Sequence, residues 1–281
     1  SSWGGSRSPA ARFTIVAMKL EGKAVAVTGG ASGLGEATVL ALAAKGAKVV
    51  ILDMNKEKAE ALLEKMGSSS ACFLECNILS EESVKSCMSA IKDKFGGLWG
   101  VVSCAGGQTM GTGLTVDKTG TAHSFSAFKK TVELNIFGTF LIASNAAALM
   151  AENTPEDEDG ERGCIINVPS VAAVEGQNGQ VAYAAGKGGI TSMALPMARD
   201  LGKRGIRVNN LMPGVFDTPM TVPMKQFRPK VYNGLLASNV FPNTRLGQPE
   251  EFAHMAVAIL ENKYVNAETI RVDGGVRMPK L

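Results

Sequence analysis

Hydrophobic residues along the chain gather in short runs that alternate with longer segments of helical periodicity. Seven runs have the composition of β-strands, at 23–29, 48–53, 71–76, 97–106, 163–168, 206–214 and 269–274. Most are apolar almost throughout, which is expected of strands covered on both faces of a parallel sheet. The helical segments lie between them, at 35–45, 57–66, 81–95, 125–152 and 249–262. The pattern predicts a single α/β domain with a doubly wound, seven-stranded parallel sheet and helices on both faces.

Three stretches interrupt this alternation. Residues 106–124 are rich in Gly and Thr, and residues 154–163 form an acidic loop that we expect to be solvated surface. Residues 216–247 contain four prolines and directly follow the end of a strand. Because ligands of such folds bind beyond the carboxyl ends of the strands, we interpret 216–247 as an irregular lid over a substrate.

Composition and charge narrow the classes of function. The 281 residues are 45% hydrophobic and 20% charged, with a net charge of +3, and the basic residues are interspersed with acidic ones. We therefore expect a small-molecule substrate and no direct nucleic-acid binding. The apolar stretch 136–151 is shorter than the ~20 residues that cross a bilayer, so it predicts a buried helix and no membrane binding. The five cysteines form no CxxC pair, which predicts reduced thiols in an intracellular protein without a metal site.

Residues 1–17 differ from the rest of the chain. They contain Arg7, Arg12 and several serines but no acidic residue, a composition typical of a mitochondrial transit segment. A cloning tag ahead of Met18 would look the same, in which case the protein would be cytoplasmic. We exclude 1–17 from the fold and assign 18–281 to the domain.

A glycine-rich turn follows the first predicted strand. Residues 28–35 read TGGASGLG and open a helix, so backbone N–H groups and the positive end of that helix can face a pyrophosphate, as in a Rossmann fold. Asp53 ends the next strand, roughly 20 residues further on. A carboxylate there accepts hydrogen bonds from the ribose hydroxyls of adenosine and repels a 2′-phosphate. The sequence therefore favours NAD(H) over NADP(H).

Tyr183 and Lys187 are spaced four residues apart, which places them on one face of a helix. A phenol has a pKa of ~10, and an ammonium group within reach would lower it by ~1 to 3 units. Ser170 follows a strand thirteen positions earlier, and Asn135 lies in the long helix before it. Their hydroxyl and amide groups could also reach a reacting oxygen at the carboxyl edge of the sheet. This set predicts acid–base chemistry at a reacting oxygen.

The combination closely resembles the short-chain dehydrogenase/reductase family, over nearly the whole chain from Met18. The family's TGxxxGxG loop, YxxxK pair and PG turn are matched by residues 28–35, 183–187 and 213–214. The resemblance implies that Tyr183 exchanges a proton with the substrate oxygen and that Lys187 holds the nicotinamide ribose while lowering the phenol's pKa. It further implies that Ser170 hydrogen-bonds the substrate oxygen, and that Asn135 anchors a water in the proton relay.

The resemblance also implies a set of cofactor-binding residues for NAD. They comprise Gly29, Ser32, Gly33, Leu34, Gly35, Asp53, Asn77, Ile78, Cys104, Ala105, Gly106, Tyr183, Lys187, Pro213, Gly214, Phe216 and Thr218. The thiol of Cys104 is expected to fill space, with its backbone facing the cofactor.

The chain departs from the family pattern at three positions. Many relatives have Asp at Asn77 beside the adenine, and an amide oxygen can still accept from the adenine amino group. Relatives commonly have Asn at Ser103, where it ties neighbouring strands together, so we expect weaker support here. Pro169 removes a backbone donor next to Ser170, which affects how that serine is placed.

Within the family, the sequence is most similar to mitochondrial members that act on acyl-CoA or steroid substrates. This similarity implies that the protein interconverts a 3-hydroxyacyl-CoA, a hydroxysteroid or another secondary alcohol with its ketone, as a homotetramer that takes part in fatty acid metabolism in mitochondria. An alternative is a dinucleotide-binding scaffold subunit of a mitochondrial RNA-processing assembly.

Overall fold

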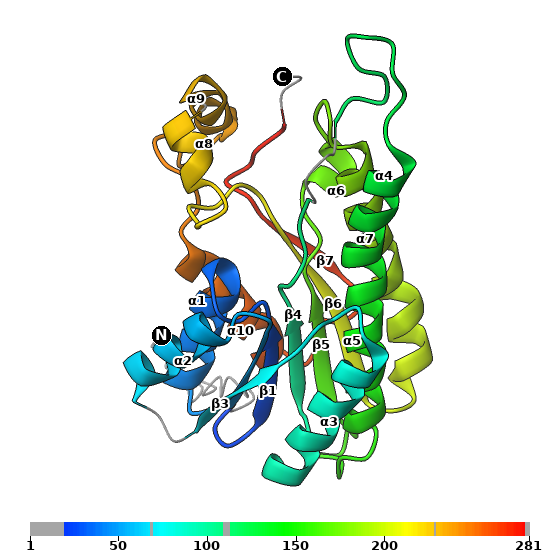
Figure 1. The fold of residues 1–281 in the computed structure, drawn as a ribbon. Coiled ribbons are helices and arrows are strands. Elements are labelled where there is room, and N and C mark those ends of the chain that lie inside the picture. The colour runs from blue at the N-terminus through cyan, green and yellow to red at the C-terminus, as the bar shows by residue number, and fades with distance from the viewer. Residues whose placement is uncertain (1–19, 68–69, 109–112, 228, 279–281) are drawn as a thin grey trace, which may run out of the picture.

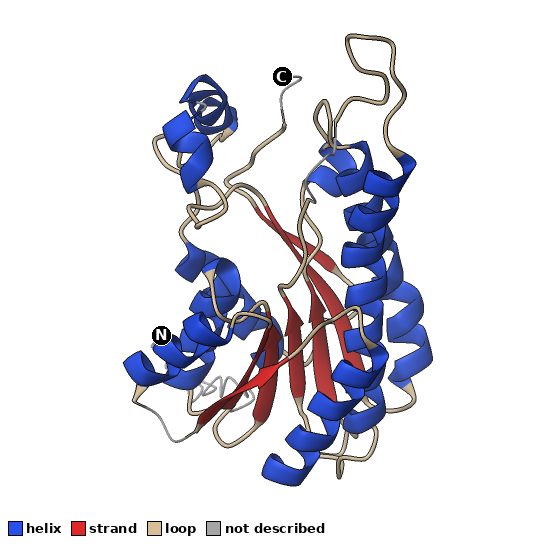
Figure 2. Cartoon of the chain, in the orientation of Figure 1, coloured by secondary structure: helices blue, strands red, loops and turns tan. Residues whose placement is uncertain are grey.

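The computed structural model describes residues 20–67, 70–108, 113–227 and 229–278. Residues 1–17, for which a transit segment or tag is expected, lie outside these ranges. The described chain forms one parallel sheet between two layers of helices (Figures 1 and 2). Its strands are β1 (Ala24–Thr28), β2 (Lys48–Asp53), β3 (Ala71–Glu75), β4 (Gly100–Ser103), β5 (Gly163–Asn167), β6 (Ile206–Pro213) and β7 (Thr269–Val272). The predicted seven-stranded parallel sheet is confirmed.

The strand order is β3-β2-β1-β4-β5-β6-β7. The chain therefore leaves the sheet in opposite directions after β1 and after β4, and the loops that follow these two strands separate. This is the topological switch point at which ligands bind in such sheets. The strands β1, β4 and β5 are buried along their whole length, which explains why their sequences are almost entirely apolar. The outer strands β3 and β7 are only partly buried.

Each face of the sheet carries its own hydrophobic core. One core packs β1 and β2 against the helices on the left of Figure 1, and its members include Val27, Leu42 and Phe252. These helices are α1 (Gly33–Ala44), α2 (Lys56–Met66) and α10 (Pro249–Glu261). The other core packs the opposite face of the sheet. Its helices are α3 (Glu81–Phe95), α5 (Gly138–Met150) and α7 (Val181–Gly202). The short helix α4 (Phe125–Val132) packs on α7.

The helix predicted over 125–152 is interrupted near its middle. A π-helical turn over Glu133–Phe137 separates α4 from α5, and Asn135 lies buried within it. By length and composition alone, the 26 residues Phe125–Met150 could cross a membrane, and 44% of their apolar window is buried in the fold. The segment packs on α7, β4 and β5. A π-helical turn redirects side chains locally and is frequent at functional sites.

The lid predicted to be irregular contains two helices. These are α8 (Val222–Phe227) and α9 (Pro229–Ser238), which stand above the sheet in Figure 1. Two of the four prolines lie at the first turns of these helices, where the missing N–H costs no helical hydrogen bond. The two ends of the segment meet, because Phe216 and Gly247 form a parallel bridge. The edge of the Phe216 ring also packs on Phe252 of α10, with the centroids 6.1 Å apart.

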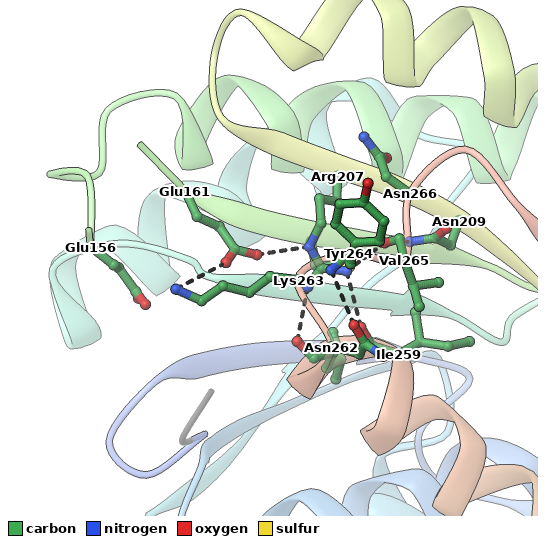
Figure 3. Close-up of polar contacts among 12 residues, drawn as sticks. Glu156, Glu161, Arg207, Asn209, Ile259, Asn262, Lys263, Tyr264, Val265 and Asn266 are labelled. Carbon is green, nitrogen blue, oxygen red and sulfur yellow. Dashed lines mark hydrogen bonds and ion pairs between the residues drawn. The ribbon is translucent and has the colours of Figure 1, made fainter. Parts of the chain in front are cut away.

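The expectation that the whole acidic loop 154–163 is solvated surface is wrong, because one of its acidic residues is buried. Glu161 is 5% exposed, and one of its oxygens accepts a 2.8 Å hydrogen bond from Nε of Arg207 (Figure 3). The rest of the Arg207 guanidinium donates to the carbonyls of Ile259, Leu260 and Val265, at the carboxyl end of α10. Burial raises the pKa of Glu161, and the hydrogen bond from Arg207 opposes that shift. This ion pair joins the acidic loop, α10 and the amino-terminal end of β6, and the lid follows the opposite, carboxyl-terminal end of β6.

Candidate active site

The glycine-rich loop after β1 forms one wall of a cavity. Gly29 and Gly33 have φ angles of +63° and +56°, in the left-handed region that other residues avoid. A Cβ atom on Gly35 would lie 2.1 Å from the carbonyl oxygen of Gly29, so no larger residue fits there. The loop leads into the first turn of α1, where backbone N–H groups lack helical partners. These backbone groups and the absence of side chains fit a pyrophosphate.

Asp53 lies beside this loop at the carboxyl end of β2. One oxygen of its carboxylate accepts from the backbone N–H of Ala31 at 3.0 Å, and the other accepts from Asn55 at 2.9 Å. The carboxylate is therefore fixed against the cavity wall. Lys56 is exposed and lies 3.7 Å from Glu60 in an ion pair, outside the cavity lining. The position of Asp53 fits a ribose with free hydroxyls.

Asn77 does not border the cavity, although the resemblance implies that it binds the cofactor. Its side chain is exposed, and its amide oxygen accepts a 3.0 Å hydrogen bond from the backbone of Leu79. The residues on either side of it, Cys76 and Ile78, line the cavity instead. In this structure the amide oxygen of Asn77 stabilises a turn, and a role of Asn77 in binding adenine stays a prediction.

The carboxyl end of β4 forms the wall opposite the glycine-rich loop. The side chain of Thr28 accepts a 3.0 Å hydrogen bond from the backbone of Ala105, which ties β1 to the end of β4. Next to it, a Cβ atom on Gly106 would lie 2.9 Å from the amide oxygen of Asn135 and 3.2 Å from Nζ of Lys187. Gly106 thus leaves space in which two predicted catalytic side chains approach the cavity wall.

The π-helical turn holds Asn135 in a fixed orientation. Its amide nitrogen donates to the carbonyls of Gly107 and Thr131, at 2.7 and 2.8 Å, and its oxygen accepts from the N–H of Gly107 at 3.2 Å. A Cβ atom on Gly186 of α7 would meet the Asn135 side chain at 3.0 Å. Asn135 therefore connects the β4 loop with the helix that carries Tyr183.

Tyr183 and Lys187 lie one turn apart on α7, as their spacing predicts. Nζ of Lys187 is 5.8 Å from the centre of the Tyr183 ring and donates a 2.9 Å hydrogen bond to the carbonyl of Val168. Lys187 is 4% exposed, and burial lowers the pKa of its ammonium to about 8. A buried ammonium poised near neutrality can respond to charge that develops close by.

The pKa of Tyr183 differs from our expectation. Burial raises it above the ordinary value, and a side-chain hydrogen bond with Ser170 lowers it in part. The ammonium of Lys187 donates to the carbonyl of Val168, and the lowering of the Tyr183 pKa by Lys187 that the sequence predicts is not found. In this arrangement Tyr183 is a phenol that can donate its proton.

Ser170 faces Tyr183 despite Pro169. Ser170 is 9% exposed, and its hydroxyl hydrogen-bonds the Tyr183 side chain and accepts from the N–H of Ala172 at 3.2 Å. The following residue, Val171, donates from its backbone to Pro213 of β6 at 3.1 Å. These contacts hold the loop after β5 without a donor at position 169.

These walls enclose one cavity of about 720 Å³. The lining residues among those predicted are Gly29, Ser32, Gly33, Leu34, Gly35, Asp53, Ile78, Cys104, Ala105, Gly106, Ser170, Tyr183, Lys187, Pro213, Gly214, Phe216 and Thr218. Asn135 lies directly behind the wall, and Asn77 lies outside it. Burial raises the pKa of the Cys104 thiol to about 12, so this thiol is protonated at neutral pH and fills space, as expected.

Several lining residues are not identified by the sequence motifs. They come from loops and from the C-terminal segment, among them Gln108, Gln180 and Met278. The methionine-rich composition of the lid indicates an apolar surface, but no pattern in the sequence shows that the C-terminal segment returns to the cavity.

No side-chain hydrogen bond joins β4 to β5 at Ser103, where many relatives have Asn. Ser103 and Asn167 are paired across the two strands and are 2% and 0% exposed. The hydroxyl of Ser103 and both polar atoms of the Asn167 amide have no partner among the described residues. Buried polar groups without partners reduce stability.

Ser103→Asn is therefore expected to stabilise the protein. An amide at position 103 can pair with Asn167, which would raise the free energy of unfolding by about 1 kcal/mol. Urea denaturation of the variant beside the wild type measures this change, with Ser103→Ala as the matched variant that cannot pair. A Ser103→Asn protein less stable than Ser103→Ala would contradict the prediction.

Comparisons with known proteins agree with this geometry. The family model described as short chain dehydrogenase matches residues 23–229. The chain is 42% identical to the 3-hydroxyacyl-CoA dehydrogenase type-2 of Homo sapiens over 92% of its own length and 97% of that protein. It is 34% identical to the ipsdienol dehydrogenase of Ips pini, over 92% and 99% of the two chains.

Solved structures show the same relationship. The crystal structure of 3-hydroxyacyl-CoA dehydrogenase type-2 from Mycobacterium avium superposes with a TM-score of 0.86 at 40% identity, over 93% of this chain and 98% of that one. A short-chain type dehydrogenase/reductase from Mycobacterium ulcerans has a TM-score of 0.80 at 26% identity, over 92% and 90%. The chain belongs to the short-chain dehydrogenase/reductase family and is an oxidoreductase.

Proposed function

We propose that the protein interconverts 3-hydroxyacyl-CoA and 3-ketoacyl-CoA with NAD(H) as cofactor. The observation that carries this proposal is the convergence of Ser170, Tyr183 and Lys187 on one cavity, with Asn135 behind its wall. Relatives named 3-hydroxyacyl-CoA dehydrogenase type-2 share 42% of the sequence over almost the whole chain, which supports the acyl-CoA substrate over a hydroxysteroid.

The substrate oxygen would bind between Ser170 and Tyr183. When the ketone is reduced, the Tyr183 phenol donates its proton to the developing alkoxide, and Ser170 donates a hydrogen bond to the same oxygen. Lys187 lies one turn further along α7, and its ammonium, which donates to the carbonyl of Val168, would hold the nicotinamide ribose. The bound dinucleotide supplies or accepts the hydride. In the opposite direction Tyr183 accepts the proton of the alcohol.

The residues that would hold the dinucleotide follow from the cavity walls. The backbone of residues 29–35 faces the pyrophosphate and Asp53 the adenosine ribose. The nicotinamide end would lie near Lys187 and the Pro213–Gly214 turn, beside the proton donor. Asn135 orients the β4 loop by its bonds to Gly107, and it could hold one water in a path for the proton.

Asp53→Ala is expected to change the cofactor preference. The wild type should use NADH well and NADPH poorly, because the carboxylate binds ribose hydroxyls and repels a 2′-phosphate. The loss of hydrogen bonds to a charged group costs about 1.5–3 kcal/mol, so kcat/KM for NADH should fall roughly 10- to 150-fold. Steady-state kinetics with both cofactors measures the ratio, and Glu57→Ala, at an exposed acid on α2, is the control. A wild type that prefers NADPH would contradict this role of Asp53.

A substrate panel tests the proposed function directly. Purified protein would be assayed for oxidation of NADH, followed by its absorbance, with acetoacetyl-CoA, longer 3-ketoacyl-CoA substrates and ketosteroids. We expect the acyl-CoA substrates to have the highest kcat/KM. If only ketosteroids are reduced, the acyl-CoA assignment is wrong, and inactivity on every ketone would contradict the proposed reaction itself.

A further inference from the structure

The C-terminal segment Asp273–Met278 returns from β7 to the catalytic loop. In Figure 1 it rises from the end of β7 between the lid helices and α6 (Ala172–Glu175). Val276 is fully buried and packs in a small cluster with Val171 and Met212, and Met278 packs against that cluster. Val171 directly follows Ser170, so the segment touches the loop that presents the catalytic serine.

An ionic clamp fixes this segment. Oε1 of Glu175 accepts a 2.7 Å hydrogen bond from Nη1 of Arg271, and Oε2 accepts one of 3.0 Å from the backbone N–H of Met278. Arg271 also binds Asp273 and the carbonyl of Val276, at 2.6 and 3.1 Å. The side chains of Glu175 and Arg271 are 19% and 27% exposed, so water screens this pair only in part.

The clamp has a direct consequence for Met278. Its side chain lines the same cavity as Ser170 and Tyr183, together with Met220 and Met224 of the lid. The three thioethers come from two separate segments and give this side of the cavity an apolar, adaptable surface. Among the described residues, one hydrogen bond holds Met278, from its backbone N–H to the carboxylate of Glu175.

We propose that Met278 is a specificity-determining residue that contacts the acyl chain of the substrate, and that Glu175 is the positioning residue that holds it there. This inference rests on the proposed function and adds to it the side chain that limits chain length. A shorter side chain at position 278 would admit a longer acyl chain, and a more rigid one would exclude it.

The first test compares two substrates in two variants. Met278→Ala is expected to raise the ratio of kcat/KM for 3-ketooctanoyl-CoA to that for acetoacetyl-CoA by roughly ten-fold, since a few methylenes in an apolar pocket discriminate at about this level. Met278→Phe is expected to lower the ratio. Met66→Ala, at a half-buried methionine of α2 outside the cavity, should leave it unchanged. A ratio that stays constant in both Met278 variants would overturn the inference.

The second test asks whether Glu175 acts through Met278. Glu175→Ala should shift the ratio of the two kcat/KM values in the same direction as Met278→Ala. The double variant should match Met278→Ala alone, because without the Met278 side chain Glu175 has nothing to position. Additive shifts would overturn the positioning role. Tryptic cleavage after Arg277, followed by intact mass, gives a readout without turnover. It should be faster in Glu175→Ala than in the wild type, and equal rates would contradict the clamp.

These outcomes separate the inference from the proposed function. If the wild type reduces neither 3-ketooctanoyl-CoA nor acetoacetyl-CoA, the proposed substrate is wrong, and the proposed role of Met278 in chain-length selection is wrong too. If the wild type reduces both and the ratios do not respond, the function stands and the inference fails.

Discussion

Tyr183→Phe is expected to lower kcat by about 10²- to 10⁴-fold, the usual contribution of a positioned acid or base. The variant loses only the phenol oxygen, which lies beside Ser170 and would exchange the proton with the substrate. The ring and its packing on α7 remain, so the affinity for NADH should change little. Turnover is measured with the best substrate of the panel, and the dissociation constant of NADH by its fluorescence.

The matched control for this variant is Tyr264→Phe. Tyr264 is fully exposed, far from the cavity lining, and its hydroxyl should not affect turnover. Full activity of Tyr183→Phe would show that another group supplies the proton. Loss of NADH binding together with turnover would indicate that the substitution disturbs the cavity instead of the proton transfer.

Arg207→Met is expected to cost about 3–5 kcal/mol of the free energy of unfolding, as usual when one partner of a buried ion pair is removed. The substitution leaves the Glu161 carboxylate buried, and it removes the donors that satisfy three carbonyls at the end of α10. Urea denaturation measures the loss. Arg207 lies at the amino-terminal end of β6, whereas the cavity lies at the carboxyl-terminal ends of the strands. At denaturant concentrations below the unfolding transition, kcat should therefore stay within about two-fold of the wild type.

Lys45→Met is the control for burial. Lys45 forms an ion pair with Glu261, which ends the helix α10 that Arg207 also contacts. The Lys45 side chain is 49% exposed, and such surface pairs contribute about 0–1 kcal/mol. If Arg207→Met costs no more than Lys45→Met, the Glu161 network does not stabilise the fold as its burial suggests.

The fold was predictable because burial leaves a strong signal in the sequence. Strands covered on both faces must be apolar, and glycines are required where the backbone turns tightly at 29–35. The lid helices could not be predicted, because α8 and α9 are short and each has a proline in its first turn, which indicates irregular structure in a sequence. The burial of Glu161 was missed for a related reason, since an acidic residue in a polar loop shows no sign of its partner on a distant strand.

The candidate site was predictable only as far as family motifs reach. Tyr183, Lys187 and Ser170 meet as their motifs imply, whereas the pKa of Tyr183 depends on the direction of the Lys187 ammonium, which spacing does not determine. Met278 belongs to none of the family motifs and reaches the cavity through contacts that hold residues 273–278 beside the loop after β5. The role of Asn77 depends on a turn of a few residues, in which a hydrogen bond to Leu79 competes with any ligand.

The bridge between Phe216 and Gly247 makes the lid a closed loop with neighbouring ends. Asp217 donates its N–H to Gly247, and Gly247 donates to Val215, at 2.8 and 3.1 Å. A segment whose ends meet can be shortened, lengthened or replaced without moving the sheet or helix α7, which carries Tyr183. In evolutionary terms, one catalytic scaffold can acquire a new substrate by exchanging a single insert.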